Sequence, residues 1–564
     1  MTISKSFLTF TIIIIISSLL LLSLTLSVKT LYGTDVYVER YYAVKQLIFG
    51  RIKLSAHQVS GCIGATLLPS IITIITRLDV DVFYRVIEPL LRILIVINVY
   101  ICIKRIHGEL FPKVIYMISS LLVVFHPTFV YTLTSAPRQS LALILFTSML
   151  LLLSKNNYPM FKRTYLSQMI LCISIPFYHY AVALLTAIII LMTAVLKIAL
   201  RKFFKTFQSQ MLLQSNSIMK HVFSGLLIIA VFFSWYMYTL AFAGIANNIK
   251  TMMKIFEAPE QKYLSIILPI GGTLSRLIHT YINLTWNAVI VVGLLRYLVG
   301  YEFYRTKADI NIYTNASEDV KASDGELIVR RSISKDDYLC VALSGLTMMV
   351  MIFLFEPISK YGLGRYHLQL LLIIVPWFID GSDLVLRFLC LLASTIHRKH
   401  AVIDNRHYQY VFILTISALM IINLFYIPEL VIDKKVIAPF MDRDNALQFM
   451  YMDVKNSDFQ ALKFVRGWLR VQNLYVVGDY FSSLSVRYVF ADYEYSLEYY
   501  NNINFTFTSG SPHIVFFRWA NVRFNKIFAW QKVYEYQSFL NELINCRMYP
   551  VSYSNKHTLI LLGL

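Results

Sequence analysis

The sequence predicts a mainly α, polytopic helical membrane protein with about eleven spans and a small C-terminal external α/β domain. Its composition is the first reason: of 564 residues, 57% are hydrophobic and 15% are charged. Soluble domains carry about 25% charged residues. The second reason is that the apolar runs are nearly continuous rather than alternating, which indicates helices and not barrel strands.

Each long apolar run is predicted to be a helix, because backbone polar groups in hydrocarbon must bond to one another. The predicted spans are 7–28, 83–103, 113–131, 139–153, 165–177, 180–200, 221–243, 281–299, 338–355, 367–396 (bent) and 408–427. The first run is longer than the apolar part of a signal peptide and lacks a clear cleavage pattern, which favours a retained span. The run 59–76 is short and contains Pro69, so it is predicted to be interfacial or re-entrant.

Clusters of Lys and Arg predict the orientation, because basic connections stay in the cytoplasm. Placing the N-terminus inside puts basic clusters into the inside connections 104–113, 154–165, 201–205, 304–337 and 397–407. The first loop, 29–82, and the C-terminus then face outward from a plasma membrane. The net charge of +20 is explained by these loops and by anionic lipid, so no nucleic-acid partner is predicted.

The character of the chain changes after Pro428, where apolar runs of spanning length stop. Residues 429–564 alternate apolar and polar side chains in stretches such as "NLYVVGDYF" and "PHIVFFRW", which indicates strands. A helix is predicted over "DFQALKFVRGWLR". The predicted domains are therefore a transmembrane domain, 1–428, with a polar cytoplasmic loop at 304–337, and an external soluble domain, 429–564.

The first loop carries the candidate catalytic residues, Asp35 and Glu39, in "GTDVYVERYY". If this stretch is helical, the two carboxylates share one face. A carboxylate held just outside the bilayer in a low-dielectric pocket can accept a proton from a nucleophile. Two alternatives stay open: Asp35 as an acid at a helix N-terminus, where the dipole favours it, and Glu39 as the partner of a cation such as Arg40.

Cationic residues at external span starts are candidates for binding a lipid phosphate, because the arginine fork matches phosphate oxygens. They are Arg138 in "APRQSLALILF" and Lys360, Arg365 and His367 in "SKYGLGRYHLQ". The alternative is that they anchor the helices at the interface and snorkel into it. Possible accessory residues are His179, Arg276 and His279.

Several other features have structural explanations. Charges inside a span are costly, so Glu88 is predicted to pair with Arg92. Asp79 and Asp81 resemble a metal-binding DxD, but they stand at a span start, where helix capping explains them. The six cysteines show no metal-ligand spacing, and no nucleotide-binding or hydrolase motif occurs. No metal or cofactor is predicted, although a divalent metal stays open.

The order of these elements resembles the GT-C superfamily of integral membrane glycosyltransferases. A first span, "GTDVYVERYY", and the Pro-containing "ATLLPSIITIITRLDVDVFYRVIEPLLRI" stand in that order. The chain is most similar to uncharacterised archaeal predicted multi-pass membrane proteins, through islands such as "GLGRYHLQLLLIIVPWF". The "WWDxG" block of oligosaccharyltransferases is absent, which argues against en bloc transfer of a glycan to protein. "APRQSLALILF" and "PFYHYAVALL" also resemble O-antigen and exopolysaccharide polymerases.

The GT-C resemblance implies sugar transfer on the outer face, as part of the cell envelope. The donor would be a polyprenyl-phosphate-linked sugar and the acceptor a glycan or protein. Asp35 stands where the superfamily keeps an acidic residue and is the implied base, with Glu39 as second choice. Alternatives are a polysaccharide polymerase, a lipid-linked sugar transporter or flippase, and a surface-anchored binding protein whose active part is the tail.

Overall fold

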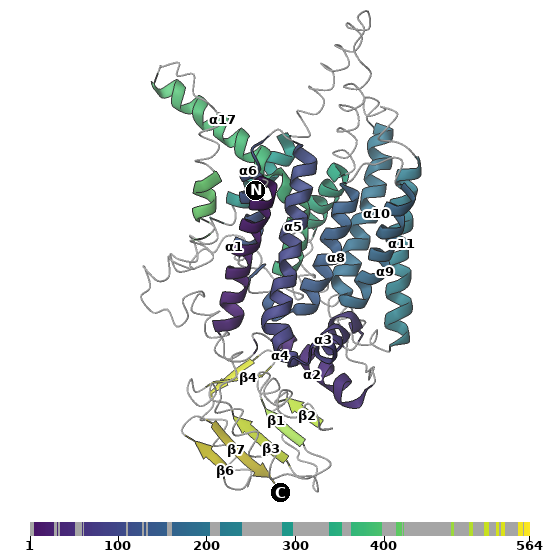
Figure 1. Cartoon of the computed structure of the whole chain (residues 1–564), viewed down its shortest axis with the longest axis vertical. Coiled ribbons are helices and arrows are strands. Elements are labelled where there is room, and N and C mark those ends of the chain that lie inside the picture. Colours follow the sequence, from purple (N-terminus) through teal and green to yellow (C-terminus); the bar gives the residue numbers. More distant parts are fainter. Residues whose placement is uncertain are drawn as a thin grey trace, which may run out of the picture.

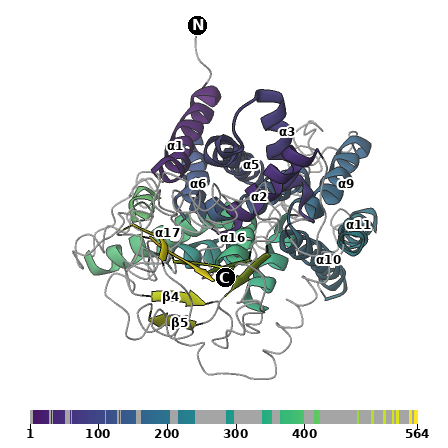
Figure 2. The same ribbon diagram turned by 90° about the horizontal axis from the view of Figure 1, so that it is seen from below.

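The computed structural model shows a bundle of helices with a β-sheet beyond one end (Figure 1). It describes residues 5–27, 31, 34–50, 59, 61–108, 111–126, 129–130, 133–154, 161–203, 215–239, 282, 285–296, 338–351, 363–397, 413–419 and 421. In the C-terminal part it describes the strands. In Figure 1 the helices α1, α5 and α8 to α11 run along the long axis, whereas α17 runs obliquely. The short helices α2 and α3 lie at the end that faces the strands, and Figure 2 shows them from below.

The helices follow the apolar runs. In chain order they are α1 (Lys5–Ser27), α2 (Thr34–Phe49), α3 (Ile63–Thr76), α4 (Val80–Val82), α5 (Glu88–His107), α6 (Lys113–Phe125), α7 (Leu133–Ser135), α8 (Pro137–Leu153), α9 (Phe161–Tyr178), α10 (Tyr180–Phe203), α11 (Ser215–Tyr238), α16 (Leu363–Ile374) and α17 (Phe378–His397). Two further helices are Thr285–Arg296 and Tyr338–Met351. Even the isoleucine run of α1 is helical, because backbone pairing within the segment outweighs the weak helix propensity of β-branched residues.

Prolines mark where the helices deviate from regular geometry. A π-helical turn, η1 (Phe83–Ile87), joins α4 to α5 just before Pro89, which has no N–H to donate. A 3-10 turn, η6 (Val375–Trp377), contains Pro376 and separates α16 from α17. The bend predicted within 367–396 is therefore confirmed.

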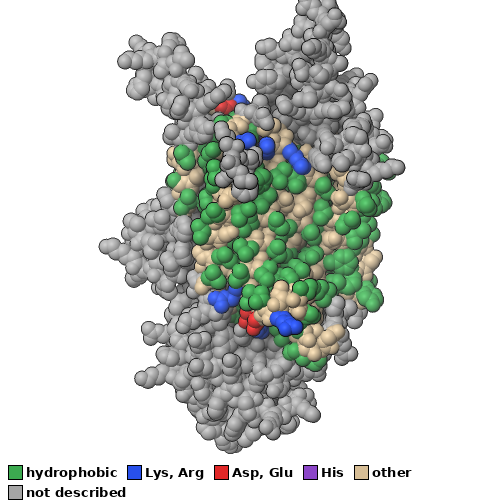
Figure 3. Space-filling model, in the orientation of Figure 1, with side chains coloured by type: hydrophobic (Ala, Val, Ile, Leu, Met, Phe, Trp, Pro, Cys, Tyr) green, Lys and Arg blue, Asp and Glu red, His purple; other side chains and the backbone are tan. Residues whose placement is uncertain are grey.

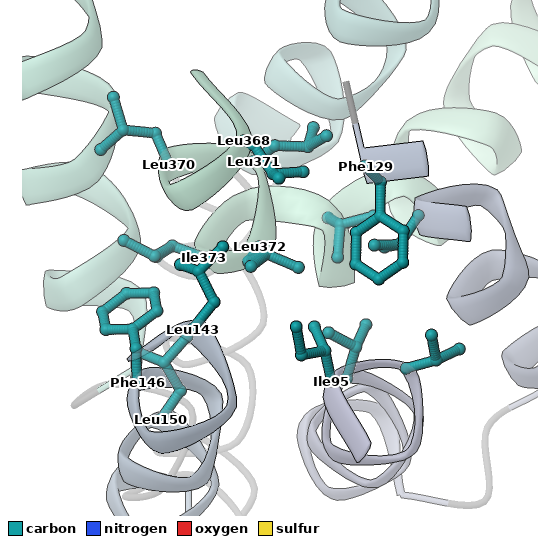
Figure 4. Packing of buried hydrophobic residues seen from close by; sticks show 14 of the residues in the cluster. Ile95, Phe129, Leu143, Phe146, Leu150, Leu368, Leu370, Leu371, Leu372 and Ile373 are labelled. Carbon is teal, nitrogen blue, oxygen red and sulfur yellow. The ribbon is translucent and has the colours of Figure 1, made fainter. Parts of the chain in front are cut away.

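The core of the bundle is made of aliphatic and aromatic side chains from helices far apart in the sequence. Helix α5 packs against α1, α6 and α8, and α9 packs against α8 and α11. Figure 4 shows Ile95 of α5, Phe129 of the α6–α8 connection and Leu143 of α8 close to the leucines of α16. Inside a membrane such contacts stabilise through van der Waals packing rather than through exclusion of water.

The surface and the helix lengths fit a membrane. On the face that Figure 3 shows, hydrophobic side chains cover the middle of the described helices, with Lys and Arg towards the two ends. By length and composition, four described segments can cross a bilayer: Val80–His107, Tyr180–Ala199, Ile218–Tyr238 and His367–Leu386. The predicted interfacial run 59–76 contains a helix of 14 residues, α3, which is shorter than the about 20 residues of a span.

The structure describes seven strands in the C-terminal part. They are β1 (Tyr475–Gly478), β2 (Ser496–Tyr499), β3 (His513–Phe517), β4 (Lys526–Ala529), β5 (Lys532–Glu535), β6 (Val551–Asn555) and β7 (Thr558–Gly563). The main sheet has the order β2-β1-β3-β7-β6, in which β1 is parallel to β2 and β3 and antiparallel pairing joins β3, β7 and β6. The strands β4 and β5 form a separate antiparallel pair. The helix predicted over 458–470 and the loop 304–337 lie outside the described residues.

Candidate active site at the first turn of α8

The predicted loop after the first span is a helix, α2, and it presents two carboxylates on one face. Asp35 lies in its first turn and Glu39 follows four residues later. An acidic side chain in the first turn interacts favourably with the helix dipole. Both carboxylates, however, bind the same partner on another helix.

That partner is Arg138, at the start of α8. Pro137 occupies the first helical turn, where its missing N–H costs no bond. The Arg138 Nη2 atom donates to Asp35 Oδ2 at 2.9 Å, and Nη1 donates to Glu39 Oε1 at 3.1 Å. The backbone N–H of Arg138 donates to Glu39 Oε2 at 3.1 Å, so Glu39 also satisfies one of the unpaired donors at the helix start. The structure therefore brings together three of the residues that the sequence singled out.

The three side chains differ in exposure. Glu39 is fully buried, Arg138 is 3% exposed, and Asp35 is 21% exposed. A buried carboxylate with both oxygens bound is held in place, whereas Asp35 has one described bond to the guanidinium and reaches solvent. Of the two candidate bases, Asp35 is the one that a substrate can approach.

Burial governs the protonation of Glu39. It raises the pKa of the Glu39 carboxyl to about 8, with the Arg138 guanidinium lowering it and Asp35 adding to the rise. The ionised form, in which both carboxylate oxygens accept bonds from Arg138, therefore predominates only above about pH 8, and below that pH the folded protein holds a proton on Glu39.

A second buried ion pair lies on α5, next to the start of α8. Arg92 on α5 binds Glu88 through Nε–Oε1 at 2.8 Å and Nη2–Oε2 at 2.5 Å, which confirms the predicted pair. Thr134 Oγ1 accepts from Arg92 Nη1 at 2.8 Å, and the Ser140 hydroxyl donates to Glu88. Arg138 and Ser140 both belong to the first turn of α8, so this turn carries partners for both networks.

Sequence reasoning missed Thr134 and Ser140. Both stand in "TLTSAPRQS", next to the Arg138 that was singled out, but hydroxyl residues in an apolar stretch more often bond their own helix backbone. Their second role, satisfying a buried ion pair on α5, depends on the packing of α5 against α8.

Glu39 does pair with a cation, as one alternative had it, but this cation is Arg138, and the neighbouring Arg40 binds Asp81. The capping interpretation of Asp79 is confirmed, since its Oδ1 accepts from the backbone N–H of Asp81 at 2.9 Å at the start of α4.

The candidate accessory histidine, His179, lies at the break between α9 and α10 and is buried. Its Nδ1 accepts from the backbone N–H of Val182 at 3.2 Å, and its ring stacks on Tyr180 with centroids 5.0 Å apart. These contacts give His179 a structural role at the start of α10.

The structure describes the remaining candidate residues only in part. His367 on α16 contacts His126, with ring centroids 5.4 Å apart, and His126 lies 5.3 Å from Trp286. Arg365 belongs to α16 by its backbone. Lys360, Arg276 and His279 lie outside the described residues. Within the described part of the chain, no three His, Cys, Asp or Glu side chains come together as metal ligands.

No protein-family model matches the chain, and no characterised protein matches it in sequence. Solved structures do resemble it. The apo oligosaccharyltransferase of Archaeoglobus fulgidus is 12% identical with a TM-score of 0.42, over 86% of this chain and 63% of its own. The chain thus spans less than two thirds of that enzyme. ArnT from Cupriavidus metallidurans bound to undecaprenyl phosphate is 9% identical with a TM-score of 0.48, over 98% of both chains.

At these identities and TM-scores the likeness carries no argument about what this chain does. What the site of this chain does follows from the contacts around Arg138.

Proposed function

We propose that this protein is a membrane glycosyltransferase that moves a sugar from a polyprenyl-phosphate-linked donor to an acceptor on the extracytoplasmic face. One observation carries the proposal. A partly exposed carboxylate, Asp35, is ion-paired with a buried arginine, Arg138, at the end of a helical bundle whose sides are apolar. A base and a cation for phosphate then stand side by side where a lipid headgroup would lie.

The proposed reaction assigns a role to each group. Asp35 accepts the proton of an acceptor hydroxyl, and that oxygen forms a bond to the anomeric carbon of the donor sugar. The bond from this carbon to the lipid phosphate breaks, and its electron pair stays on the phosphate oxygen. Arg138 stabilises the charge of the leaving phosphate. Lys360 and Arg365 are proposed to add positive charge around the same phosphate, with His367 as a neutral hydrogen-bond donor.

The experiment compares transfer by purified wild-type protein and Asp35→Asn, with a polyprenyl-phosphate sugar and an acceptor. We expect Asp35→Asn to lower the rate at least about 100-fold, the contribution of a general base. The matched control is Asp81→Asn, because Asp81 is also 21% exposed and also pairs with an arginine. This control should keep most of the activity.

Equal transfer by wild type and Asp35→Asn would remove Asp35 from the mechanism. Equal losses in both variants would mean that the effect of Asp35→Asn is structural. The length of the product is read in the same assay: a single added sugar is expected, and a ladder of repeat units would instead indicate a polymerase.

A further inference from the structure

The guanidinium of Arg138 is incompletely used although it is buried. Its Nη1 binds Glu39 and its Nη2 binds Asp35. Its Nε, in contrast, has no hydrogen-bond partner among the residues that the structure describes. A buried donor without an acceptor costs about 1–3 kcal/mol, so an incoming acceptor at this N–H would be stabilising.

In another buried arginine of this chain, Arg92, the same edge is filled. In Arg92 the Nε and Nη2 atoms form a fork that binds both oxygens of Glu88. In Arg138 the corresponding pair of atoms, Nε and Nη2, binds a single oxygen, because only Nη2 donates, to Asp35 Oδ2. The fork of Arg138 is therefore half occupied, and it fits a planar pair of oxygens such as two oxygens of a phosphate.

The two carboxylates on Arg138 are not held equally. Glu39 is fully buried and takes two bonds, from Nη1 and from the backbone N–H. Asp35 is 21% exposed and accepts from Nη2. Partly exposed ion pairs are weak, whereas separating a buried pair leaves a charge without compensation. An incoming anion would therefore replace Asp35 and leave Glu39 in place.

We propose that the Nε–Nη2 edge of Arg138 is a subsite for one phosphate group, and that a phosphate bound there displaces Asp35 from Nη2 while Glu39 holds the guanidinium. Glu39 is then a positioning residue and not a base. This inference rests on the proposed function, because it gives the phosphate of the donor a second task. Asp35 loses its cationic partner only when the phosphate is present, and a carboxylate without that partner is a stronger base.

The experiment measures how accessible the Asp35 carboxyl is, without any sugar or acceptor. Purified protein is treated with a carbodiimide and an amine, and the amide formed on Asp35 is quantified by peptide mass spectrometry. The additions are a short-chain polyprenyl phosphate, inorganic phosphate, or the uncharged polyprenol. We expect labelling of Asp35 to rise about fivefold with polyprenyl phosphate, as expected for release from a weak ion pair. Labelling of Asp81, the matched control, should not change.

The arms separate the sources of the phosphate. A rise with polyprenyl phosphate alone supports a subsite for a lipid-borne phosphate, and a rise with inorganic phosphate as well supports recognition of the phosphate group itself. An equal rise with polyprenol, or no rise with either phosphate, would overturn the proposal.

Arg138→Lys tests the fork, because lysine keeps the charge and lacks the paired donors. In this variant the phosphate-dependent rise should disappear while Asp81 labelling stays at the wild-type value, which reports that the fold is intact. A rise as large as in wild type would exclude the fork as the binding element.

Failure of this inference and failure of the proposed function give different results. Phosphate-dependent labelling without any sugar transfer would keep the subsite and reject the transferase. Sugar transfer that needs Asp35, without any phosphate-dependent labelling, would keep the transferase and reject the exchange.

Discussion

At the residue scale, the environment of Arg138 divides the roles of two carboxylates that look equivalent in the sequence. Glu39 lies four residues after Asp35 on the same helix face. Glu39 is enclosed by the start of α8 and bonds to both the backbone and the side chain of Arg138. Asp35, in contrast, is partly exposed. A substrate can therefore contact Asp35, whereas Glu39 is buried.

The raised pKa of Glu39 predicts a pH dependence of stability. A carboxyl whose pKa moves from 4.5 to about 8 on folding holds an extra proton in the folded state between these values. Because the folded protein then binds more protons than the unfolded chain, its stability falls as the pH rises from about 5 to about 8. Glu39→Gln removes this contribution.

Thermal unfolding of the purified protein at pH 5 and pH 8 measures the effect. The fall in Tm between the two values should be larger in wild type than in Glu39→Gln, by on the order of 5 °C. Asp35→Asn should reduce the wild-type fall without abolishing it, because Asp35 is one of the causes of the raised pKa. Parallel changes of Tm in wild type and Glu39→Gln would contradict the prediction.

At the scale of elements, two glycines determine how closely α17 crosses the helix Thr285–Arg296. A Cβ added at Gly381 would meet the backbone oxygen of Val289, and one added at Gly293 would meet the backbone oxygen of Trp377. Small residues at crossings let the backbones of membrane helices approach one another. The two glycines face each other at this crossing, so neither can be replaced without separating the helices.

Gly381→Ala should therefore destabilise the protein, because a backbone atom cannot move aside as a side chain does. We expect a loss of about 2 kcal/mol or more, as for an overpacked core. The matched control is Gly345→Ala, whose Cβ would meet only side-chain atoms of Ile373, the nearest at 3.3 Å. Thermal unfolding of the two variants should show a much lower Tm for Gly381→Ala, and similar Tm values would contradict the role of the crossing.

At the scale of the whole molecule, the candidate site and the C-terminal strands lie at the same end of the bundle (Figures 1 and 2). The predicted orientation places both outside the cell, with the start of α6 on the cytoplasmic side. Arg77, at the end of α3, and Lys113, at the start of α6, are both exposed and stand near opposite ends of the bundle. They form a matched pair for testing the orientation.

In intact cells, a membrane-impermeant thiol reagent should label Arg77→Cys and should label Lys113→Cys only after permeabilisation. The variants are made in a background without the six native cysteines, of which the four described ones are buried. The reverse pattern would invert the orientation and place Asp35 in the cytoplasm, where the proposed extracytoplasmic transfer would be impossible.

Much of the helical architecture was predictable, because in hydrocarbon a long apolar run has few alternatives to a helix. The bend at Pro376 and the capping by Asp79 are local effects and were predicted from local sequence. The sequence did not decide whether the segment of α2 is helical, since its mixed aromatic and charged residues give weak periodicity. The identity of the cation that pairs with Glu39 was not predictable, because Arg138 lies on a different helix, 99 residues away in the sequence.

The sequence by itself determined that this is a helical membrane protein, that its chain changes character after Pro428, and that Asp35 and Arg138 are chemically capable of base and phosphate roles. These properties follow from the composition, the lengths of the apolar runs and the chemistry of the side chains. Only the tertiary structure decided that Asp35 and Arg138, 103 residues apart, form an ion pair, and that Glu39 is buried beneath it. The physical reason is that the packing of α2 against α8 sets these distances, and no local pattern encodes them.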